Sequence, residues 1–379
     1  MKPFISLVVK PTLECNISCR HCYHPPEERV PGLMDDATLE RVVRLASEEY
    51  ETVWFIWHGG EPLLAPLSFF KRAVELQDRY FGKDSHRCGN TVQTNGVTID
   101  RRFMDFCRDR RINVGVSYEG ELNDELRQMS RDTAAAIDMM SRRGYMFSVS
   151  CTMCRTTAAS MPDLYGYFSG RGINASFSPV VPIGCAASNG TTPDPDEYAR
   201  ASIETFDRWV TDSGSDVALL PHYLYLLNAL GDPQPSDCQH TSCLTRWLSV
   251  HPGGDLYPCG KGRPPEFRLC NISEVGRLSD AFRTEGFARL LEGTVARREK
   301  CAECPIYAYC NGGCSMDAYH EGGLENNGGD SCRIYRQVFS HVQRTVGSIL
   351  EDRPDLSGYN RYVRDAVVGK LVNPMITGQ

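Results

Sequence analysis

From the N-terminus to about residue 179, short apolar runs alternate with longer stretches in which apolar residues recur every three or four positions. The short runs are rich in β-branched and aromatic residues and predict six strands, at 5–9, 53–57, 91–93, 114–117, 147–152 and 175–179. The longer stretches predict helices at 36–50 and near 67–80, 100–110, 132–143 and 161–170. Strands that alternate with helices form a parallel sheet, so the pattern predicts an α/β fold with a partial (β/α)6 TIM-like barrel.

Beyond the predicted barrel the pattern changes. A polar loop at 180–196 leads into helices predicted near 195–211 and 219–230, and from 238 to 332 the chain is rich in glycine and cysteine with little continuous apolar pattern. There we expect bound metal to substitute for a core. A helix predicted at 334–350 follows. We therefore expect a barrel at 1–180, a helical bridge at 181–235, a small cysteine-rich iron-sulfur domain at 236–350 and a helical tail at 351–379.

Charge and hydropathy exclude several classes of partner. The chain of 379 residues has 41 Lys and Arg against 48 Asp and Glu, a net charge of -7, and no basic run, which argues against nucleic acid. No run of 18 apolar residues occurs, so we expect no membrane association, and the apolar start is too short for a signal peptide. We expect a cytoplasmic protein. Its 17 cysteines then favour metal or redox chemistry over a disulfide framework.

Three of these cysteines, Cys15, Cys19 and Cys22, lie close together after the first predicted strand, with C-x3-C-x2-C spacing. A four-iron cluster is normally held by four thiolates, so three leave one iron open to a small molecule, much as a catalytic zinc keeps an open position. A zinc knuckle or a disulfide loop is the alternative. The open position indicates chemistry at this loop.

Unusual segments also end the next three strands: Gly59 to Pro62, Gln93 to Gly96 and Ser117 to Gly120. Parallel α/β barrels build their active sites at the carboxyl ends of their strands, so these segments should converge with the cysteines. The glycine pair lets backbone approach a ligand closely, although a tight turn would have the same sequence.

The cysteine spacing and its setting resemble the radical S-adenosylmethionine (SAM) enzymes. The resemblance implies that SAM chelates the open iron and that one electron cleaves SAM to a 5′-deoxyadenosyl radical, which abstracts a substrate hydrogen.

The resemblance also implies that the Gly-Gly-Glu-Pro stretch binds the methionyl amine of SAM. Ser117 would contact the ribose or methionyl group, although many relatives have Asp where this chain has Glu119. Arg127 would pair bidentately with the SAM carboxylate, with Arg131 as a competitor, and His21 would lie near the adenine. The expected cofactor-binding residues are thus Gly59, Gly60, Glu61, Gln93, Asn95, Ser117, Arg127 and His21.

The cysteines from 238 to 332 closely resemble the SPASM domain of radical SAM peptide and protein maturases. Matched to that family, an inner four-iron cluster would be held by Cys238, Cys243, Cys259 and Cys314, and an outer one by Cys301, Cys304, Cys310 and Cys332. The expected cofactors are therefore three [4Fe-4S] clusters and SAM. Clusters with all four ligands filled suit electron transfer, and structural zinc is the alternative.

The overall layout is similar to that of the anaerobic sulfatase-maturating enzymes, which oxidise a Cys or Ser of a client protein to formylglycine. In that family an aspartate base directly follows a Tyr-Pro-Cys step. Here Cys259 is followed by Gly260, which cannot accept a proton. We therefore favour a maturase that crosslinks a ribosomally made precursor peptide while the auxiliary clusters accept the electron.

Other reactions remain open. Formylglycine formation is the first alternative, and a small-molecule radical SAM dehydrogenase or a non-catalytic iron-sulfur electron carrier is another. Epimerisation would need a thiol hydrogen donor, for which Cys185 and Cys270 are candidates. The candidate proton acceptors are Lys261, Asp255, Tyr257 and His251. Besides the peptide, the expected partner is an external one-electron reductant of the flavodoxin or ferredoxin type.

Overall fold

The structure is a computed structural model that describes residues 2–83, 85–234, 238, 243–261, 265–352 and 355–372. It contains two compact units. Unit 1 comprises Met1–Ser117, Asp124–Phe147 and Cys243–Glu292, and unit 2 comprises Tyr118–Asn123, Ser148–Ser242 and Gly293–Gln379. The four ranges expected from the sequence cut the chain differently and stay a prediction.

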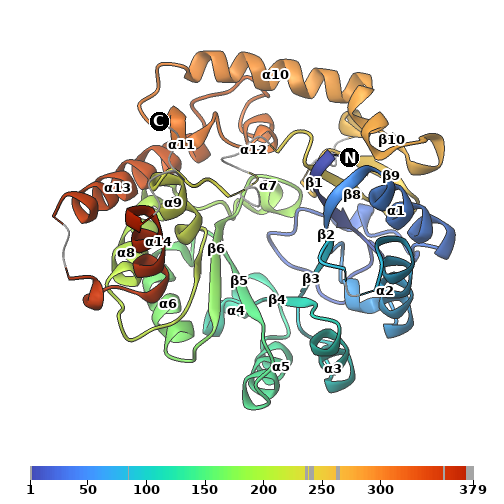
Figure 1. The fold of residues 1–379 in the computed structure, drawn as a ribbon, viewed down its shortest axis with the longest axis horizontal. Coiled ribbons are helices and arrows are strands. Elements are labelled where there is room, and N and C mark those ends of the chain that lie inside the picture. Colours follow the sequence, from blue (N-terminus) through green and yellow to red (C-terminus); the bar gives the residue numbers. More distant parts are fainter. Residues whose placement is uncertain are drawn as a thin grey trace. The chain divides into compact units, whose positions relative to one another are not determined.

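Unit 1 is built on a sheet whose strands run in the order β10-β9-β8-β1-β2-β3-β4 (Figure 1). Its bounds are β1 (Lys2–Val9), β2 (Tyr50–Trp57), β3 (Cys88–Thr94), β4 (Asn113–Ser117), β8 (Trp247–Val250), β9 (Asp255–Tyr257) and β10 (Cys270–Asn271). The strands from β8 to β4 are parallel, and β9 and β10 are antiparallel additions. Val9 is in register with Trp57 of β2 and Val250 of β8, so the loops after these strands start at one edge.

The helices of unit 1 are α1 (Asp36–Glu49), α2 (Leu67–Phe81), α3 (Arg101–Asp109), α4 (Asn123–Leu126), which begins at the unit boundary, and α5 (Ser130–Arg142). Ile5, Leu7 and Val9 of β1 are completely buried, which places the core on the central strand. The first helix starts where the Asp35 carboxylate accepts a hydrogen bond from the Thr38 amide, at 2.7 Å. The core therefore fixes the strand from which the cysteine loop departs.

Unit 2 contains the parallel strands β5 (Ser148–Met153), β6 (Asn174–Pro179) and β7 (Leu219–Leu220). Its helices are α6 (Met161–Ser169), α7 (Cys185–Asn189), α8 (Pro195–Val210), α9 (His222–Ala229), α11 (Tyr307–Cys310), α12 (Ser315–His320), α13 (Asp330–Asp352) and α14 (Arg361–Val372). Helix α10 (Glu285–Cys301) begins in unit 1 and ends in unit 2. The long helix α13 packs on α8 and α9, which gives the C-terminal cysteines a helical support.

Short 3-10 turns connect these elements, at η1 (Pro26–Glu28), η2 (Pro62–Leu64), η3 (Gly120–Leu122), η4 (Ala158–Ser160), η5 (Pro265–Phe267), η6 (Ile272–Glu274), η7 (Leu278–Arg283) and η8 (Leu356–Gly358). In the part of the chain that the structure describes, no helix has the length and apolar character needed to cross a lipid bilayer.

The predicted fold class is confirmed, with parallel strands and intervening helices in the expected chain order and a cysteine-rich C-terminal region. The expectation that metal replaces a core throughout 238–332 is wrong for its first half. Leu248, Val250 and Leu256 are completely buried there, because β8 and β9 extend the sheet of unit 1. These strands, together with α7, β7 and α10, were not predicted.

Candidate functional site

The cysteine loop, residues 15–22, follows β1 and is held by groups from two other segments. Arg29 donates from Nη1 to the Ile17 carbonyl at 3.0 Å and from Nε to the His24 carbonyl at 3.3 Å. On the other side, the Arg20 amide donates to the Leu126 carbonyl at 2.8 Å. The loop is therefore shaped by the protein itself, and its three thiols are only partly exposed.

Gly59 and Gly60 allow the loop after β2 to touch the backbone just before the first cysteine. The Gly60 amide donates to the Thr12 carbonyl at 3.1 Å, and the next amide donates to the Glu14 carbonyl at 2.7 Å. A Cβ atom on Gly59 would lie 2.3 Å from the Thr12 carbonyl oxygen, and one on Gly60 would lie 2.0 Å from that of Glu14. Gly59 also has φ +129°. The tight-turn interpretation is therefore insufficient, since the glycines make a close backbone contact.

The Glu61 carboxylate joins two of the loops. It is buried and accepts hydrogen bonds from the Leu63 amide at 3.0 Å, the Thr94 hydroxyl at 2.7 Å and the Asn95 amide at 2.7 Å. Burial raises its pKa, while these three donors act in the opposite direction. We expected this carboxylate to face a cationic ligand, but the described hydrogen bonds go to the protein, and a role in binding SAM stays a prediction.

Asn95 continues this connection to the cysteines. Its Nδ2 donates to Asn16 Oδ1 at 2.7 Å and lies 3.9 Å from Cys15 Sγ, while its carbonyl accepts from the Thr133 hydroxyl at 3.0 Å. Burial raises the pKa of the Cys15 thiol. An amide directed at a ligating sulfur is one of the groups that tune an iron-sulfur cluster. The loop after β3 thus reaches the cysteine loop, as the barrel argument predicted.

Gln93 and Ser117 contact each other at the ends of β3 and β4, where Gln93 Nε2 donates to the Ser117 hydroxyl at 2.9 Å. The Gln93 side chain lies over Gly115, since a Cβ there would be 2.4 Å from its Oε1. The structure therefore brings this predicted pair together through a direct hydrogen bond.

His21 and Arg127 are electrostatic neighbours. Burial, together with the positive charge of Arg127, lowers the pKa of His21 to about 2, so the ring is neutral. Its Nδ1 is buried and has no hydrogen-bond partner among the described residues. A neutral ring nitrogen without a partner suits contact with a bound ligand. Arg131, the competing arginine, is exposed on α5.

Lys10 is a site residue that the sequence analysis missed. It follows β1 directly and is completely buried, with Nζ 3.3 Å from His24 Nε2 and 3.3 Å from the Gly260 carbonyl. Burial and the positive charge of Lys10 lower the pKa of His58 to about 4, and that of His251 to about 2. The available signal was a lysine directly after the apolar run Val8 and Val9.

The candidate proton acceptors differ in their surroundings. Asp255 pairs with Arg268 at 2.9 Å and accepts from Asn271 Nδ2 at 2.9 Å, so its carboxylate is already engaged. Tyr257 is half-buried and stacks on His251 at 4.5 Å between ring centroids, and burial raises its pKa. Lys261 follows Gly260 in the same loop. These three and His251 therefore stay candidates, and Asp255 is the weakest.

The two thiols considered as hydrogen-atom donors for epimerisation lie in different compact units. Burial raises the pKa of Cys270 to about 11, which keeps this thiol of β10 protonated in unit 1. Cys185 starts α7 in unit 2.

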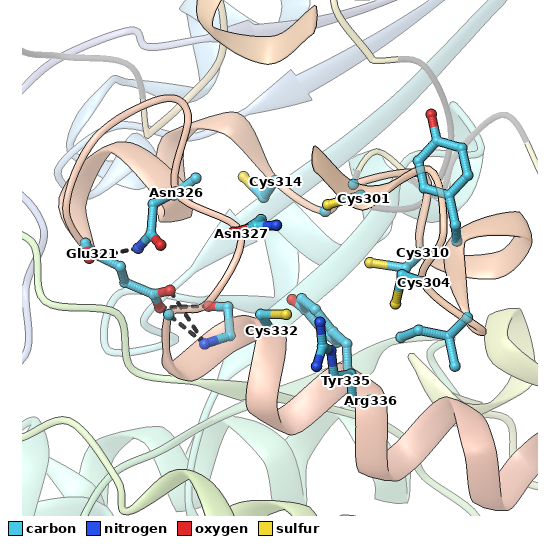
Figure 2. Close-up of a pocket in the computed structure, with 17 residues that line it drawn as sticks. Cys301, Cys304, Cys310, Cys314, Glu321, Asn326, Asn327, Cys332, Tyr335 and Arg336 are labelled. Atoms are coloured by element: carbon cyan, nitrogen blue, oxygen red, sulfur yellow. Dashed lines mark hydrogen bonds between the residues drawn. The ribbon is translucent and has the colours of Figure 1, made fainter. Parts of the chain in front are cut away.

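Unit 2 has a second cysteine site, a cavity of about 40 Å³ that we call the C-terminal cavity (Figure 2). Its cysteines are Cys301, Cys304, Cys310, Cys314 and Cys332. Glu321 closes the loop that leads to the last of these, because its carboxylate accepts from the Ser331 hydroxyl at 2.6 Å and its carbonyl accepts from Asn326 at 2.7 Å. The four outer-set cysteines thus line one cavity, together with a fifth.

The inner set cannot be assembled within one unit. Cys238 and Cys314 belong to unit 2, whereas Cys243 and Cys259 belong to unit 1. The inner cluster therefore stays an expectation from the sequence.

The cysteines of both sites are donors that iron-sulfur clusters use. In the described part of the chain, no three His, Cys, Asp or Glu side chains are placed to hold one metal ion. In a cluster each thiolate binds a different iron, so its ligands are spread more widely than around zinc. The C-terminal cavity is lined by five cysteines, and a [4Fe-4S] cluster needs four thiolates, so its donor set fits such a group. At the cysteine loop, Gly60 and Asn95 provide the close backbone contact and the amide beside sulfur.

Comparison with known proteins agrees with this geometry. Residues 9–156 match the model of the radical SAM superfamily. The cysteine-type anaerobic sulfatase-maturating enzyme of Clostridium perfringens is 27% identical over 368 residues, which cover 90% of this chain and 96% of that protein. A solved structure described as native anSMEcpe with bound AdoMet is 25% identical, with a TM-score of 0.80 over 92% of this chain and 100% of that chain.

A more distant solved structure is Streptococcus suis SuiB bound to the precursor peptide SuiA. It has a TM-score of 0.64 and 17% identity, and the match covers 86% of this chain and 75% of that chain, so this likeness concerns the fold alone. The chain therefore carries a radical SAM domain and is similar, along most of its length, to the anaerobic sulfatase-maturating enzymes.

Proposed function

We propose that the chain is a radical SAM maturase that removes a hydrogen atom from a residue of a ribosomally made peptide and forms an intrapeptide crosslink. The observation that carries the radical step is the cysteine loop, held against the glycine pair by backbone hydrogen bonds and against Asn95 by side-chain contacts. When bound there, the cluster and SAM supply a 5′-deoxyadenosyl radical. The protein groups hold the loop, leave one iron position open and place a neutral His21 nearby.

The choice of crosslinking over formylglycine formation is supported by Gly260. The base of the similar enzymes would occupy this position, and glycine has no side chain to accept a proton. The amine that reaches the Gly260 backbone here is that of Lys10, from the opposite end of the sequence. With glycine in place of an aspartate, the polar groups at this position would differ from those in the sulfatase-maturating enzymes.

Crosslinking also uses the C-terminal cysteines. The peptide loses two hydrogens in all, one as an atom to the 5′-deoxyadenosyl radical and the other as a proton. Closing the new bond leaves one electron to remove, and clusters with four thiolate ligands suit that transfer. The proposed cofactors are thus three [4Fe-4S] clusters and SAM, with an external one-electron reductant for the first cluster.

Formylglycine formation is the second candidate, because the similarity to the sulfatase-maturating enzyme of C. perfringens covers 90% of this chain. The two reactions are separated by supplying reconstituted protein, SAM and dithionite with two peptides. One is a sulfatase-type peptide with the target cysteine, and the other is encoded by a short reading frame beside this gene. Formylglycine replaces the thiol of a cysteine by an aldehyde, whereas a crosslink only removes two hydrogens.

Gly260→Asp makes this experiment sharper. A Cβ at Gly260 would lie 3.6 Å from Val8 Cγ1, which is ordinary van der Waals contact, so the variant should fold. We expect the wild type to leave the sulfatase-type peptide unchanged and the variant to gain formylglycine formation. Mass spectrometry of the peptide is the measurement, and Gly253→Ala, with nothing within 4 Å of the added atom, is the control. Formylglycine from the wild type would overturn the crosslinking proposal.

A further inference from the structure

Two arginines place positive charge near the cysteines of the C-terminal cavity. Arg336 of α13 lines the cavity together with Cys304 and Cys332, and these two cysteines are its largest electrostatic partners. Arg336 lies on the exposed side of the helix, and Figure 2 shows it beside Cys332 at the edge of the cavity. A guanidinium beside two sulfurs from different segments acts through its charge on whatever the sulfurs bind.

Arg297 of α10 adds a second positive charge from inside unit 2. It is 1% exposed, and its hydrogen bonds reach the Gly312 carbonyl at 2.8 Å, the Ser315 hydroxyl at 2.9 Å and the Leu324 carbonyl. Its electrostatic partners include three cavity cysteines, Cys314, Cys301 and Cys310. Arg297 therefore both holds the cysteine-bearing loops and brings charge to the cavity.

These charges matter for the direction of electron flow. Each thiolate ligand adds a negative charge to a cluster, and reduction adds one more, so nearby positive charge stabilises the reduced form. Hydrogen bonds to the sulfurs act in the same direction because they withdraw electron density from the ligands. A cluster bound at this cavity would accept an electron more readily than one held by the same thiolates without arginine.

We propose that Arg336, supported by the buried charge of Arg297, raises the reduction potential of the cluster at the C-terminal cavity and so makes it an electron acceptor. This inference rests on the proposed function, since it requires an iron-sulfur cluster at Cys301, Cys304, Cys310 and Cys332. Arg336 is a positioning and tuning residue, which acts on the substrate only through the cluster.

Redox titration separates tuning from a structural role. The starting protein has Cys15, Cys19 and Cys22 changed to Ala, which removes the first cluster and leaves the auxiliary ones. It is reconstituted anaerobically, its iron and sulfide are counted, and its midpoint potentials are measured by electron paramagnetic resonance. Three variants in this background are compared: Arg336→Gln, which keeps donors without charge, Arg336→Lys, which keeps the charge, and Arg333→Met.

We expect Arg336→Gln to shift one midpoint potential to a more negative value at unchanged iron content. Arg336→Lys should stay close to the parent. Arg333, one turn away on α13, pairs instead with Asp196 at 2.7 Å, so Arg333→Met should shift nothing. Parent-like potentials in Arg336→Gln would overturn the proposal. Loss of iron in Arg336→Gln but not in Arg336→Lys would also overturn it, since that result means a structural role.

Failure of the proposed function has a different signature. If the parent protein contains zinc in place of iron at the auxiliary sites, the auxiliary-cluster proposal fails in the metal analysis before any potential is measured, and the tuning inference falls with it. If the parent contains iron and Arg336 has no effect, only the tuning inference fails.

Discussion

At Gly60 the absence of one side-chain carbon permits the contact between two loops. A methyl group there would lie 2.0 Å from the Glu14 carbonyl oxygen and 2.5 Å from that of Leu13, and both atoms are backbone, so neither moves without the cysteine loop. A tight turn with any side chain at residue 60 could therefore not replace the glycine pair.

Gly60→Ala should consequently displace the cysteine loop and prevent the first cluster from forming. We expect a loss of about four irons per chain and of SAM cleavage, while the auxiliary iron is retained. Iron and sulfide analysis with a 5′-deoxyadenosine assay measures both effects. Gly253→Ala, which adds the same atom in open space of the same unit, should match the wild type. Normal iron content in Gly60→Ala would contradict the contact described here.

Much of the cysteine loop's setting could be predicted from residues, but its side-chain partners could not. The spacing of the cysteines and the positions of the strand ends predicted which loops meet. Glu61 was expected to face a ligand because a carboxylate is a good partner for an amine. Its actual hydrogen bonds to Thr94 and Asn95 depend on how β2 and β3 align, which composition does not encode. Lys10 was missed because its contacts with His24 and Gly260 also depend on how distant segments align.

Helix α10 shows why some elements escaped the sequence analysis. Its buried positions, Phe287, Leu290, Thr294 and Arg297, recur at helical spacing, but the last two are polar. Both polar side chains can be buried because they have hydrogen-bond partners there. The Thr294 and Ser315 hydroxyls lie 2.8 Å apart, and Arg297 donates to a loop carbonyl. An apolar pattern therefore stops after one turn although the helix continues. The strands β8 to β10 were missed because they contain four residues or fewer.

The packing of α13 gives a prediction for stability. Phe339 is 1% exposed and lies against the rings of Tyr225, Tyr309 and Tyr335, of which Tyr335 lines the C-terminal cavity. We expect Phe339→Ala to lower the free energy of unfolding by about 3–5 kcal/mol and to reduce the iron bound at the cavity. Denaturant titration and iron analysis measure these effects.

The control for this variant is the surface ion pair that joins Arg333 of α13 to Asp196 of α8. Asp196 and Arg333 are each about half exposed, so Asp196→Ala should change the free energy of unfolding by less than about 1 kcal/mol. Equal effects of the two variants would mean that the aromatic contacts do not hold α13 in place.

The contact between α8 and α9 gives a prediction for pH. His222 is completely buried, and its Nε2 lies 2.9 Å from the Ser202 hydroxyl; burial lowers its pKa to about 4. The unfolded chain, with a histidine pKa near 6.5, takes up the proton first as the pH falls. The stabilising contribution of the neutral ring is thus complete above pH 6.5 or so and is lost as the pH falls toward about 4.

Between about pH 7.5 and pH 5, this one group should lower the free energy of unfolding by about 2 kcal/mol. Urea titrations at both values measure the difference. His222→Gln should remove that part of the pH dependence, whereas His86→Gln, at an exposed position, should leave it intact. An unchanged dependence in His222→Gln would show that the buried ring is not its source.

At the scale of the whole molecule, the two cysteine sites belong to different compact units and should be separable by mutation. Changing Cys301, Cys304, Cys310 and Cys332 to Ala should remove about four irons from a total of about twelve, yet leave SAM cleavage by the first cluster. The crosslinked product should be lost because the cluster that we propose as the electron acceptor is absent. Iron analysis, 5′-deoxyadenosine and peptide mass are measured together, and full product formation would exclude an electron-accepting role for this set.

The hydrogen bonds of Glu61 also bear on how the protein acquires its iron. The carboxylate ties together the loops after β2 and β3, and the backbone beside it holds the start of the cysteine loop, all through groups of the polypeptide itself. We therefore expect the loops around the first cluster to keep their positions when the cluster is lost. A chain whose first cluster has been destroyed by oxygen should then bind iron and sulfide again without unfolding and refolding.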